Sequence, residues 1–415
     1  MDTLIKAVGL LFLFLSSSVL ALDVSLHGVD ISLGGFLQGN YTPRIVDGND
    51  FILAEERFQL KLEASYSGVS IFTKTDVFYD AVGNEVGFDI REAYLDYFSK
   101  LWDVRVGRQI ITWGVGDLIF INDFFPKDFA AFFEGRPLEY LKKGVDAFKF
   151  DLYLNIISME FILIPFFERD TLPSPPRFII FDPFSQIKDR EIEEPETNLE
   201  NTQLALRLYR NILGFDASLY IYKGFFLIPA VEPDNLASPT KLILFFPRLA
   251  VYGASLQGSV FSGVLSLEGA YYDSLDDRNG DDPAVTNSQT KFLVGFQREL
   301  WRDFTAEFQY SGEYMYEYGE YLQTLPPGFP KQDRFRQLMT LRLTQFLRYQ
   351  TLRLSFFAFF SPSGKDYMLI PEVRYNITDH LWAALGANIF GGKETTFFGQ
   401  LDKNDNVYIV LRYEF

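Results

Sequence analysis

Hydrophobic and polar residues alternate with a period of two through most of the chain. In the clearest stretch, 304–318, every even position carries Phe, Tyr, Ala or Gly, and most odd positions carry Thr, Glu, Gln or Ser. A helix would place residues i and i+3 on one face, but here they fall in opposite classes. The stretch is also much longer than a globular strand of about 5–6 residues. We therefore expect a tilted strand that crosses a bilayer, with apolar side chains facing lipid.

Segments with this alternation recur along the rest of the chain, separated by connections that are in turn short and long. Eighteen candidate strands lie near 26–41, 51–66, 68–80, 86–98, 101–112, 143–152, 154–165, 199–210, 213–225, 246–257, 261–273, 290–299, 303–318, 335–348, 350–360, 366–377, 380–390 and 405–415. The predicted fold class is all-β, a closed antiparallel transmembrane β-barrel of about 18 strands, with 16 as the alternative count. Short periplasmic turns and long extracellular loops are typical of such barrels.

The two ends of the chain indicate its destination. Residues 1–21 have the features of a cleaved secretory signal, with Lys6 before an apolar stretch and small or apolar residues before the cleavage point. Residues 22–415 then form a single barrel domain. The terminal Phe415 shares a strand face with Tyr413 and Leu411, similar to the C-terminal signature that outer-membrane barrels present to the barrel assembly machinery. We expect the protein in the outer membrane of a Gram-negative cell, in contact with its lipid and, through Phe415, with that machinery.

Composition excludes several classes of protein. The chain has no cysteine, which rules out disulfides, thiolate metal sites, iron–sulfur clusters and covalently attached c-type haem. Its net charge of −17 argues against nucleic acid as a partner. The two histidines, His27 and His380, both fall near the periplasmic side, so no catalytic triad can form at the outer rim. The acidic stretch 276–282 lacks the spacing of a calcium loop. We predict no enzymatic activity and no cofactor.

Charges of both signs occupy the polar positions of the predicted strands. By alternation, the side chains expected to point into the lumen are Arg57, Lys61, Glu63, Arg207, Asp216, Glu268, Glu307, Glu313, Glu317, Arg342, Arg353, Glu372, Arg374, Arg412 and Glu414. Two interpretations remain open. These charges pair across strands and stiffen the wall, or they form a transverse field that screens solutes.

Aromatic residues gather at the turns and in the long loops. Trp102, Trp301 and Trp382 each lie beside a short turn, where the inner aromatic girdle of a barrel is expected. The loops 113–135, 177–184 and 225–246 carry many Phe and Ile side chains, which would be a liability if exposed. We expect these loops to fold inward or onto each other, either as a packed cap or as an apolar lining for a solute.

A stretch of about forty residues resembles a known group of proteins. The segments 91–97 (Arg-Glu-Ala-Tyr-Leu-Asp-Tyr), 106–114 (Val-Gly-Arg-Gln-Ile-Ile-Thr-Trp-Gly) and 122–128 (Asn-Asp-Phe-Phe-Pro-Lys-Asp) are similar to a family of proteobacterial outer-membrane barrels with a Gly-Arg-Gln…Trp-Gly strand end. The resemblance implies a porin-like barrel that works with envelope export or lipid-trafficking systems. Arg108, Gln109 and Trp113 would then either anchor a constriction or pin the base of the largest inward loop.

These observations predict a porin-like channel for passive passage or export of a small solute, with an apolar or amphiphilic solute among the candidates. The alternative is a structural barrel that acts as a sheath or docking partner for a periplasmic exporter or an electron-transfer cytochrome; self-association is a further option. The candidate lumen and constriction residues are Arg57, Lys61, Arg108, Gln109, Trp113, Glu268, Glu307, Glu313, Glu317, Arg342, Arg353, Glu372 and Arg374.

Overall fold

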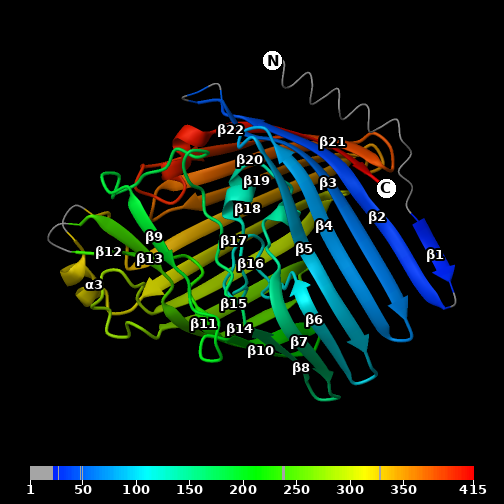
Figure 1. Ribbon diagram of the computed structural model, residues 1–415, viewed down its shortest axis with the longest axis horizontal. Helices are drawn as coiled ribbons and strands as arrows, with labels where there is room; N and C mark the ends of the chain where they lie inside the picture. The colour runs from blue at the N-terminus through cyan, green and yellow to red at the C-terminus, as the bar shows by residue number, and fades with distance from the viewer. Residues whose placement is uncertain (1–21, 27, 47, 49, 236–238, 327–328) are drawn as a thin grey trace.

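Eighteen antiparallel strands form one closed barrel, which confirms the predicted fold class and strand count (Figure 1). The computed structural model describes residues 22–415 except 27, 47, 49, 236–238 and 327–328, so the predicted signal segment 1–21 and His27 lie outside the described residues. The barrel strands are β2 (Val29–Pro43), β3 (Phe51–Tyr66), β4 (Val69–Asp80), β5 (Glu85–Phe98), β6 (Trp102–Gln109), β7 (Val145–Tyr153), β8 (Ser158–Ile164), β10 (Gln203–Ile212), β11 (Phe215–Phe225), β14 (Arg248–Val260), β15 (Gly263–Ser274), β16 (Gln289–Trp301), β17 (Phe304–Met315), β18 (Phe335–Leu347), β19 (Leu352–Ser361), β20 (Asp366–Asn376), β21 (Leu381–Gly391) and β22 (Asn406–Glu414).

The other elements belong to the N-terminus and to the connections between barrel strands. They are β1 (Leu22–Leu26), β9 (Asp189–Glu193), β12 (Ala230–Pro233), β13 (Lys241–Phe245), α2 (Phe129–Phe133), α3 (Tyr318–Thr324), η1 (Leu138–Tyr140) and η2 (Gly399–Asn404). Strands β9, β12 and β13 form a small separate sheet among the long loops. None of the described helices is long and apolar enough to cross a membrane.

The barrel closes between its first and last strands. β2 pairs with β22 from Phe36↔Glu414 to Tyr41↔Ile409. The backbone of Phe415 extends this pairing, because its N–H and C=O exchange two hydrogen bonds of 3.0 Å with Gly35. Glycine is needed at position 35, since a Cβ there would lie 2.0 Å from the carbonyl oxygen of Gln59. β22 reaches only part of β2, and β1 pairs with β2 over Val29–Leu33, where β22 does not extend.

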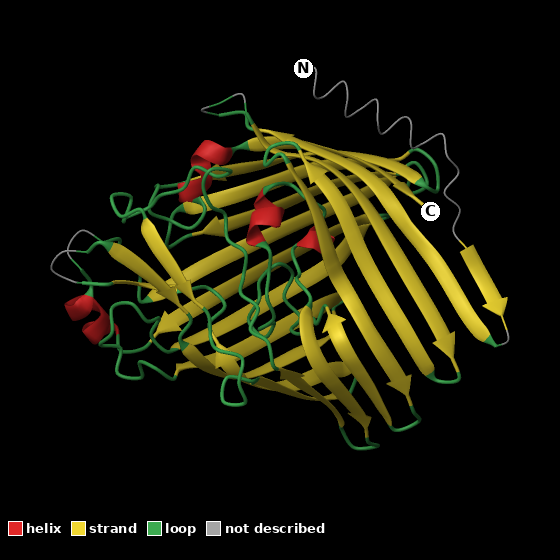
Figure 2. Ribbon diagram, in the orientation of Figure 1, coloured by secondary structure: helices red, strands yellow, loops and turns green. Residues whose placement is uncertain are grey.

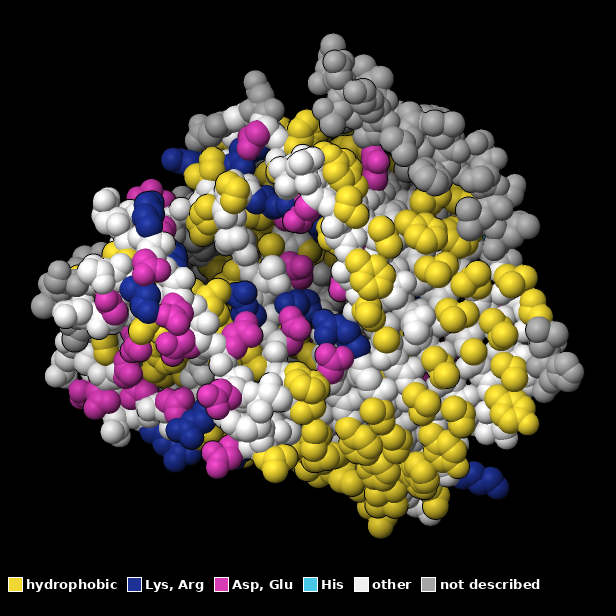
Figure 3. All heavy atoms as spheres, in the orientation of Figure 1, with side chains coloured by type: hydrophobic (Ala, Val, Ile, Leu, Met, Phe, Trp, Pro, Cys, Tyr) yellow, Lys and Arg dark blue, Asp and Glu magenta, His cyan; other side chains and the backbone are white. Residues whose placement is uncertain are grey.

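The predicted alternation of faces is present in the wall. On β17, Phe308 is 49% exposed on the outside, whereas the neighbouring Gln309 is 1% exposed inside the barrel. Figure 3 shows the outer face of the wall as a broad field of hydrophobic side chains. The prediction was wrong at the end of this strand: β17 stops at Met315, and Glu317 is an exposed residue that precedes α3 in a left-handed conformation. Glu317 therefore does not point into the lumen.

The tryptophans at the short turns divide into two groups. Trp102 and Trp301 are 36% and 58% exposed on the outer face, consistent with the expected girdle. Trp382 is 6% exposed and pairs across the sheet with the inward-facing Arg412. Its indole donates to the Glu414 carboxylate at 3.0 Å and lies under the Arg374 guanidinium, 3.9 Å from the ring centroid. The girdle prediction for Trp382 was therefore wrong, because its strand register places it on the inner face.

Candidate functional site: a loop braced across the lumen

The connection between β6 and β7, residues 110–144, enters the barrel and crosses the lumen; we call it the inward loop. It carries α2 and η1, and Figure 2 shows these helical turns inside the ring of strands. Its first half bonds to β15, β17 and β18, and its second half bonds to β2, β21 and β22. The loop is therefore fastened to well-separated parts of the wall, and it divides the lumen.

Glu268 of β15 fastens the first half of the inward loop. Its carboxylate accepts hydrogen bonds from the backbone N–H groups of Val115 and Gly116 (the latter at 2.5 Å), and from the backbone and side-chain amides of Asn122 at 3.1 and 2.9 Å. The side chain is 5% exposed. A buried carboxylate surrounded by four N–H donors is a charge-assisted anchor. Glu268, predicted as a lumen residue, thus faces inward but holds the loop.

Asp117 provides the second polar contact of this half. Its backbone N–H donates to the Gln309 side chain at 2.9 Å, and its C=O accepts from the same amide at 2.9 Å. Its carboxylate forms a two-point ion pair with Arg342 of β18, with one N–O distance of 2.9 Å. Arg342, a predicted constriction residue, therefore reaches the inward loop. Both side chains of the pair remain about a quarter exposed, at 27% and 29%.

Aromatic packing fastens the second half. Phe133 of α2 packs edge-on against Phe390 of β21, with ring centroids 5.6 Å apart, and Phe132 packs edge-on against Phe359 of β19 at 6.3 Å. All four rings are at most 9% exposed. The inner faces of β19 and β21 are therefore apolar where α2 docks.

Side-chain amides and a hydroxyl from the wall satisfy the carbonyl groups that follow α2. Asn388 and Asn406 both donate to the Phe133 carbonyl, at 3.1 and 3.2 Å. Asn40 donates to the carbonyl of Gly135 at 3.2 Å, and Thr42 donates to that of Glu134 at 2.8 Å. Buried carbonyl groups need such partners, because an unpaired one is costly.

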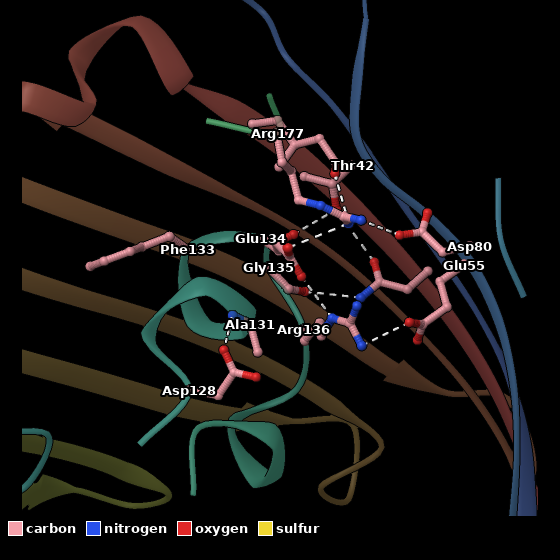
Figure 4. Close-up of polar contacts among 12 residues, drawn as sticks. Thr42, Glu55, Asp80, Asp128, Ala131, Phe133, Glu134, Gly135, Arg136 and Arg177 are labelled. Atoms are coloured by element: carbon pink, nitrogen blue, oxygen red, sulfur yellow. Dashed lines mark hydrogen bonds and ion pairs between the residues drawn. The ribbon is translucent and has the colours of Figure 1, made fainter. Parts of the chain in front are cut away.

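An ion network joins the end of α2 to β3 and β4 (Figure 4). Arg136 pairs with Glu55 at 2.7 Å and with Glu134 at 2.8 Å. Arg177, from the loop after β8, pairs with Asp80 and lies 3.4 Å from Glu134. Burial raises the pKa of Glu134, although Arg136 and Arg177 act in the opposite direction.

The network is continued by Arg57, which pairs with Glu55 at 2.7 Å and Asp76 at 2.6 Å. Arg57 is thus neutralised by carboxylates.

The residues of the Gly-Arg-Gln…Trp-Gly motif lie at the base of the inward loop. Gly107 has a φ of +125°, and a Cβ there would lie 2.3 Å from the Ala93 carbonyl oxygen. Gln109 is 1% exposed and donates to the Ala147 carbonyl at 3.1 Å. Trp113 donates from its indole to Glu160 at 3.0 Å. Arg108 pairs with Asp146 at 3.1 Å. These contacts join the loop to β7 and β8 at the point where it leaves the wall.

The apolar side chains of the long loops are mostly packed together. Trp113, Phe124 and Phe125 are at most 7% exposed, and they pack against inward tyrosines such as Tyr220 and Tyr222. In the other two loops Phe178, Phe225 and Phe246 are also buried, while Ile179 and Ile228 are exposed. This arrangement matches the expected packed cap better than an open apolar lining.

Of the remaining predicted residues, Glu307 lies beside the inward loop, because it faces Arg342 across the sheet, and the others lie elsewhere on the inner wall. Arg353 pairs with Glu372 at 2.6 Å, and Arg374 stacks on Trp382. Glu313 pairs with Lys291 at 3.2 Å and with Arg336. Lys61 and Glu307 are half-buried and make no ion pair within the described part of the chain. We call Lys61, Glu307, Arg353, Glu372 and Arg374 the short-turn vestibule; these side chains retain contact with solvent on the side of the short turns.

Sequence reasoning missed the loop side chains that make the anchors. Asp117, Asn122 and Arg136 lie within a stretch dominated by Phe, Ile and Gly, and strand alternation says nothing about loop residues. Their isolation within an apolar loop is itself a signal, because polar residues in a buried loop need hydrogen-bond partners on the wall. Among the described residues, no group of three or more His, Asp or Glu side chains is arranged to hold a metal ion.

Known structures share this fold. OccK5 (OpdH) of Pseudomonas aeruginosa superposes with a TM-score of 0.56 at 9% identity, covering 92% of this chain and 97% of that one. OccK3 (OpdO) of the same organism gives 0.55 at 10% identity, covering 93% and 95%. OccAB3 of Acinetobacter baumannii gives 0.54 at 8% identity, covering 93% and 99%. Comparison with described protein families and with curated proteins finds no match.

The class that the fold defines is the closed 18-stranded antiparallel β-barrel, which these solved structures share. At identities of 8–10%, the likeness extends to the fold alone. The particular Gly-Arg-Gln family of the sequence resemblance therefore remains a prediction.

Proposed function

We propose that this protein is an outer-membrane channel through which a small solute passes by diffusion, in a lumen narrowed by the inward loop. The observation that carries the proposal is the bracing of residues 110–144 across a closed 18-stranded barrel. A barrel of this size has room for an aqueous channel. A loop held at both ends restricts that channel to solutes of limited size, because it cannot swing aside freely.

The charges of the lumen support a role in selecting solutes. Around the loop they are paired, as Glu55 and Asp76 are with Arg57. In the short-turn vestibule, which we propose faces the periplasm, Lys61 and Glu307 keep contact with solvent. We propose that the unpaired vestibule charges act on passing solutes, whereas the paired charges hold the constriction in shape.

Liposome swelling with sugars and amino acids of graded size tests the proposal. Purified protein should let the smaller solutes enter at a rate proportional to the amount of protein, with a sharp decline as solute size grows. Liposomes that stay impermeable to every solute would contradict a channel. If the impermeable barrel also copurified with a second envelope protein, the alternative of a structural sheath or docking partner would gain support.

We also propose that the mature chain begins at residue 22, after removal of the signal segment 1–21, and forms one domain. The features of residues 1–21, with Lys6 ahead of an apolar stretch and small or apolar residues before the cleavage point, support this division. Recognition of the C-terminal strand by the assembly machinery is supported by the position of Phe415 at the barrel seam. The mass of the protein extracted from outer membranes tests the cleavage point. A mass that includes residues 1–21 would contradict it.

A further inference from the structure

The barrel wall has an interruption between β5 and β6. β5 pairs with β4 from Glu85↔Asp80 to Tyr97↔Val69, but it pairs with β6 only over Ala93–Phe98. β6 ends at Gln109, where the chain turns inward, and Figure 1 shows it ending well below the outer end of β5. Residues 85–92 of β5 therefore have no neighbouring strand on one side. In a closed barrel such a free edge is unusual, because closure normally pairs every edge.

A cavity of about 500 Å³ lies beside this free edge and is lined in part by residues of β5. It is lined on the inside by Phe78 and Tyr140 and on the outside by Phe88. Phe78 belongs to the inner face, since it pairs with Gly87 between Asp76 and Asp80, which are buried inside. Phe88 is 66% exposed and lies on the outer face opposite Val77. The cavity lining therefore includes residues from both faces of the wall at this edge, and we infer that the cavity opens between them.

The outer mouth of the cavity is bordered by an apolar surface. Val86, Phe88 and Ile90 point outward from β5 and are 76%, 66% and 41% exposed, and the adjoining Val77 of β4 is 44% exposed. Outward apolar side chains of a transmembrane barrel lie against acyl chains. The mouth therefore opens beside lipid of the outer leaflet. Figure 3 shows charged side chains gathered in the hollowed part of this face, next to the hydrophobic field.

A buried arginine without a carboxylate partner lies at the free edge. Arg91 is 5% exposed and lines the cavity. Its Nη2 donates to the carbonyls of Glu139 at 2.5 Å and Lys142 at 3.1 Å, and its guanidinium lies 4.2 Å from the centre of the Tyr140 ring. Its Nη1 is buried and has no hydrogen-bond partner among the described residues. Burying a cation with an unpaired N–H group costs free energy unless an anion binds and pairs with it.

The other cations that line the cavity already have partners. Arg57 pairs with Asp76, Arg108 with Asp146, Lys142 with Asp123 and Lys143 with Glu168. The acidic side chains of Glu85 and Asp89 also line the cavity, but they are exposed to water. Arg91 is thus the cation of this cavity that makes no ion pair within the described chain, and Asp128, which also lines the cavity, accepts a hydrogen bond from the Ala131 N–H instead.

We propose that the gap between β5 and β6 is a lateral port that admits an amphiphile with an acidic headgroup, such as a fatty carboxylate. The headgroup pairs with the Arg91 guanidinium, whose Nη1 is packed away from solvent and turns toward the cavity when the anion binds, and the alkyl chain lies along Phe88 and its apolar neighbours. The amphiphile thereby moves between the outer leaflet and the space beside the inward loop. This proposal names a solute class for the proposed channel, but the binding step also operates in a barrel that conducts nothing.

Photo-crosslinking in liposomes tests the port. The probe is dodecanoate with a diazirine in its chain, and adducts are mapped by mass spectrometry. Adducts should appear both on residues 86–90, outside the wall, and on residues 136–140, inside it. The yield inside should fall about tenfold in Arg91→Gln, the fold-change expected for loss of one charge-assisted hydrogen bond. Adducts confined to 86–90 would overturn the port, because the probe would not have passed the wall.

Controls separate a port from a fault in folding or from a site for any anion. Arg298→Gln, which removes an exposed cation on β16, should leave the yield unchanged, and Arg91→Lys should restore part of it. Phe88→Glu, which touches only the mouth, should lower the yield inside while the loop stays docked.

Unlabelled dodecanoate should compete, whereas acetate and dodecyltrimethylammonium should not. Competition by acetate would overturn the amphiphile in favour of a free anion. Liposome swelling is independent of these results, so failure of the channel and failure of the port are distinguishable.

Discussion

The two halves of the inward loop combine polar and apolar contacts in different ways: the first half also buries Ile119 and Ile121 in an apolar cluster, and the second half also carries the ion pairs of Arg136. Residues 115–122 are held by carboxylates, through Glu268 and the ion pair of Asp117 with Arg342. The segment after residue 128 is held by the aromatic contacts of Phe132 and Phe133. Carboxylate anchors specify where the chain sits, because their geometry is directional, while ring burial supplies more free energy per residue. We infer that α2 is the more stable end and that residues 115–122 are the end that yields first.

The largest effect is expected from Phe133→Ala. Removing a buried ring leaves a cavity in the cluster with Phe390, which should cost about 3–5 kcal/mol of docking free energy. Hydrogen exchange of residues 129–136 measures the loss. The matched control is Phe360→Ala, because Phe360 lies on the lipid face and is 49% exposed. If exchange rises equally in both variants, α2 is not held by ring packing.

Glu268→Gln should produce the next largest effect. The substitution removes the charge and turns an NH₂ group toward backbone donors, so at least one buried N–H loses its partner, at a cost of about 2–3 kcal/mol. Exchange of the amides of residues 115 to 122 should rise, while that of α2 stays as in the wild type. Glu63→Gln, which neutralises an exposed inward carboxylate, is the control. Unchanged exchange at 115–122 would show that Glu268 is not the anchor.

A smaller effect is expected for the ion pair of Arg342 with Asp117. Because both side chains are partly exposed, their coupling in a double-mutant cycle should be about 1 kcal/mol. Arg342→Ala, Asp117→Asn and the double variant supply the cycle, with loop exchange as the readout. Strictly additive effects of the two substitutions would mean that the pair does not hold the loop.

The smallest effect concerns pH. Burial raises the pKa of Asp170, in the loop after β8, to about 6, even though the Lys127 backbone N–H donates to its carboxylate at 2.7 Å. The usual pKa of an aspartic acid is about 4, so Asp170 holds its proton more tightly when the loop is packed than when the loop is released. Packing should be most stable below about pH 4 and should weaken as the pH rises through 6.

Proteolysis of this loop, compared between wild type and Asp170→Asn at each pH, tests that sign. The variant should resist protease better than the wild type at pH 8, and the two should be equal near pH 4. A wild type that is the more resistant at pH 8 would show that the ionised carboxylate stabilises the loop.

The wall was predictable because alternation is a local property of a strand. The segment 51–66 was placed to the residue, and the lumen face of Arg57, Glu268 and Arg342 followed from the same rule. The rule failed where a strand ended early, as at Glu317, and at Trp382, where proximity to a turn says nothing about the face.

The anchors of the inward loop were not predictable in the same way. Asp117 meets Gln309 and Arg342 across about two hundred positions of sequence, and no local pattern encodes that distance. The free edge of β5 was missed as well, since 101–112 was expected as a full-length strand and β6 ends at Gln109. The strand ends where Gln109 is buried at the base of the inward loop, a consequence of packing rather than of alternation.

The central claim is that the inward loop sets the size of a conducting lumen. Single-channel recording in planar bilayers tests it most directly, by comparing the wild type with the Glu268→Gln, Arg342→Ala double variant. We predict a stable small conductance for the wild type and a larger, noisier one for the variant, because residues 115–122 are released into the lumen. Equal conductances would contradict the role of the loop, and silence in both proteins would contradict the channel itself.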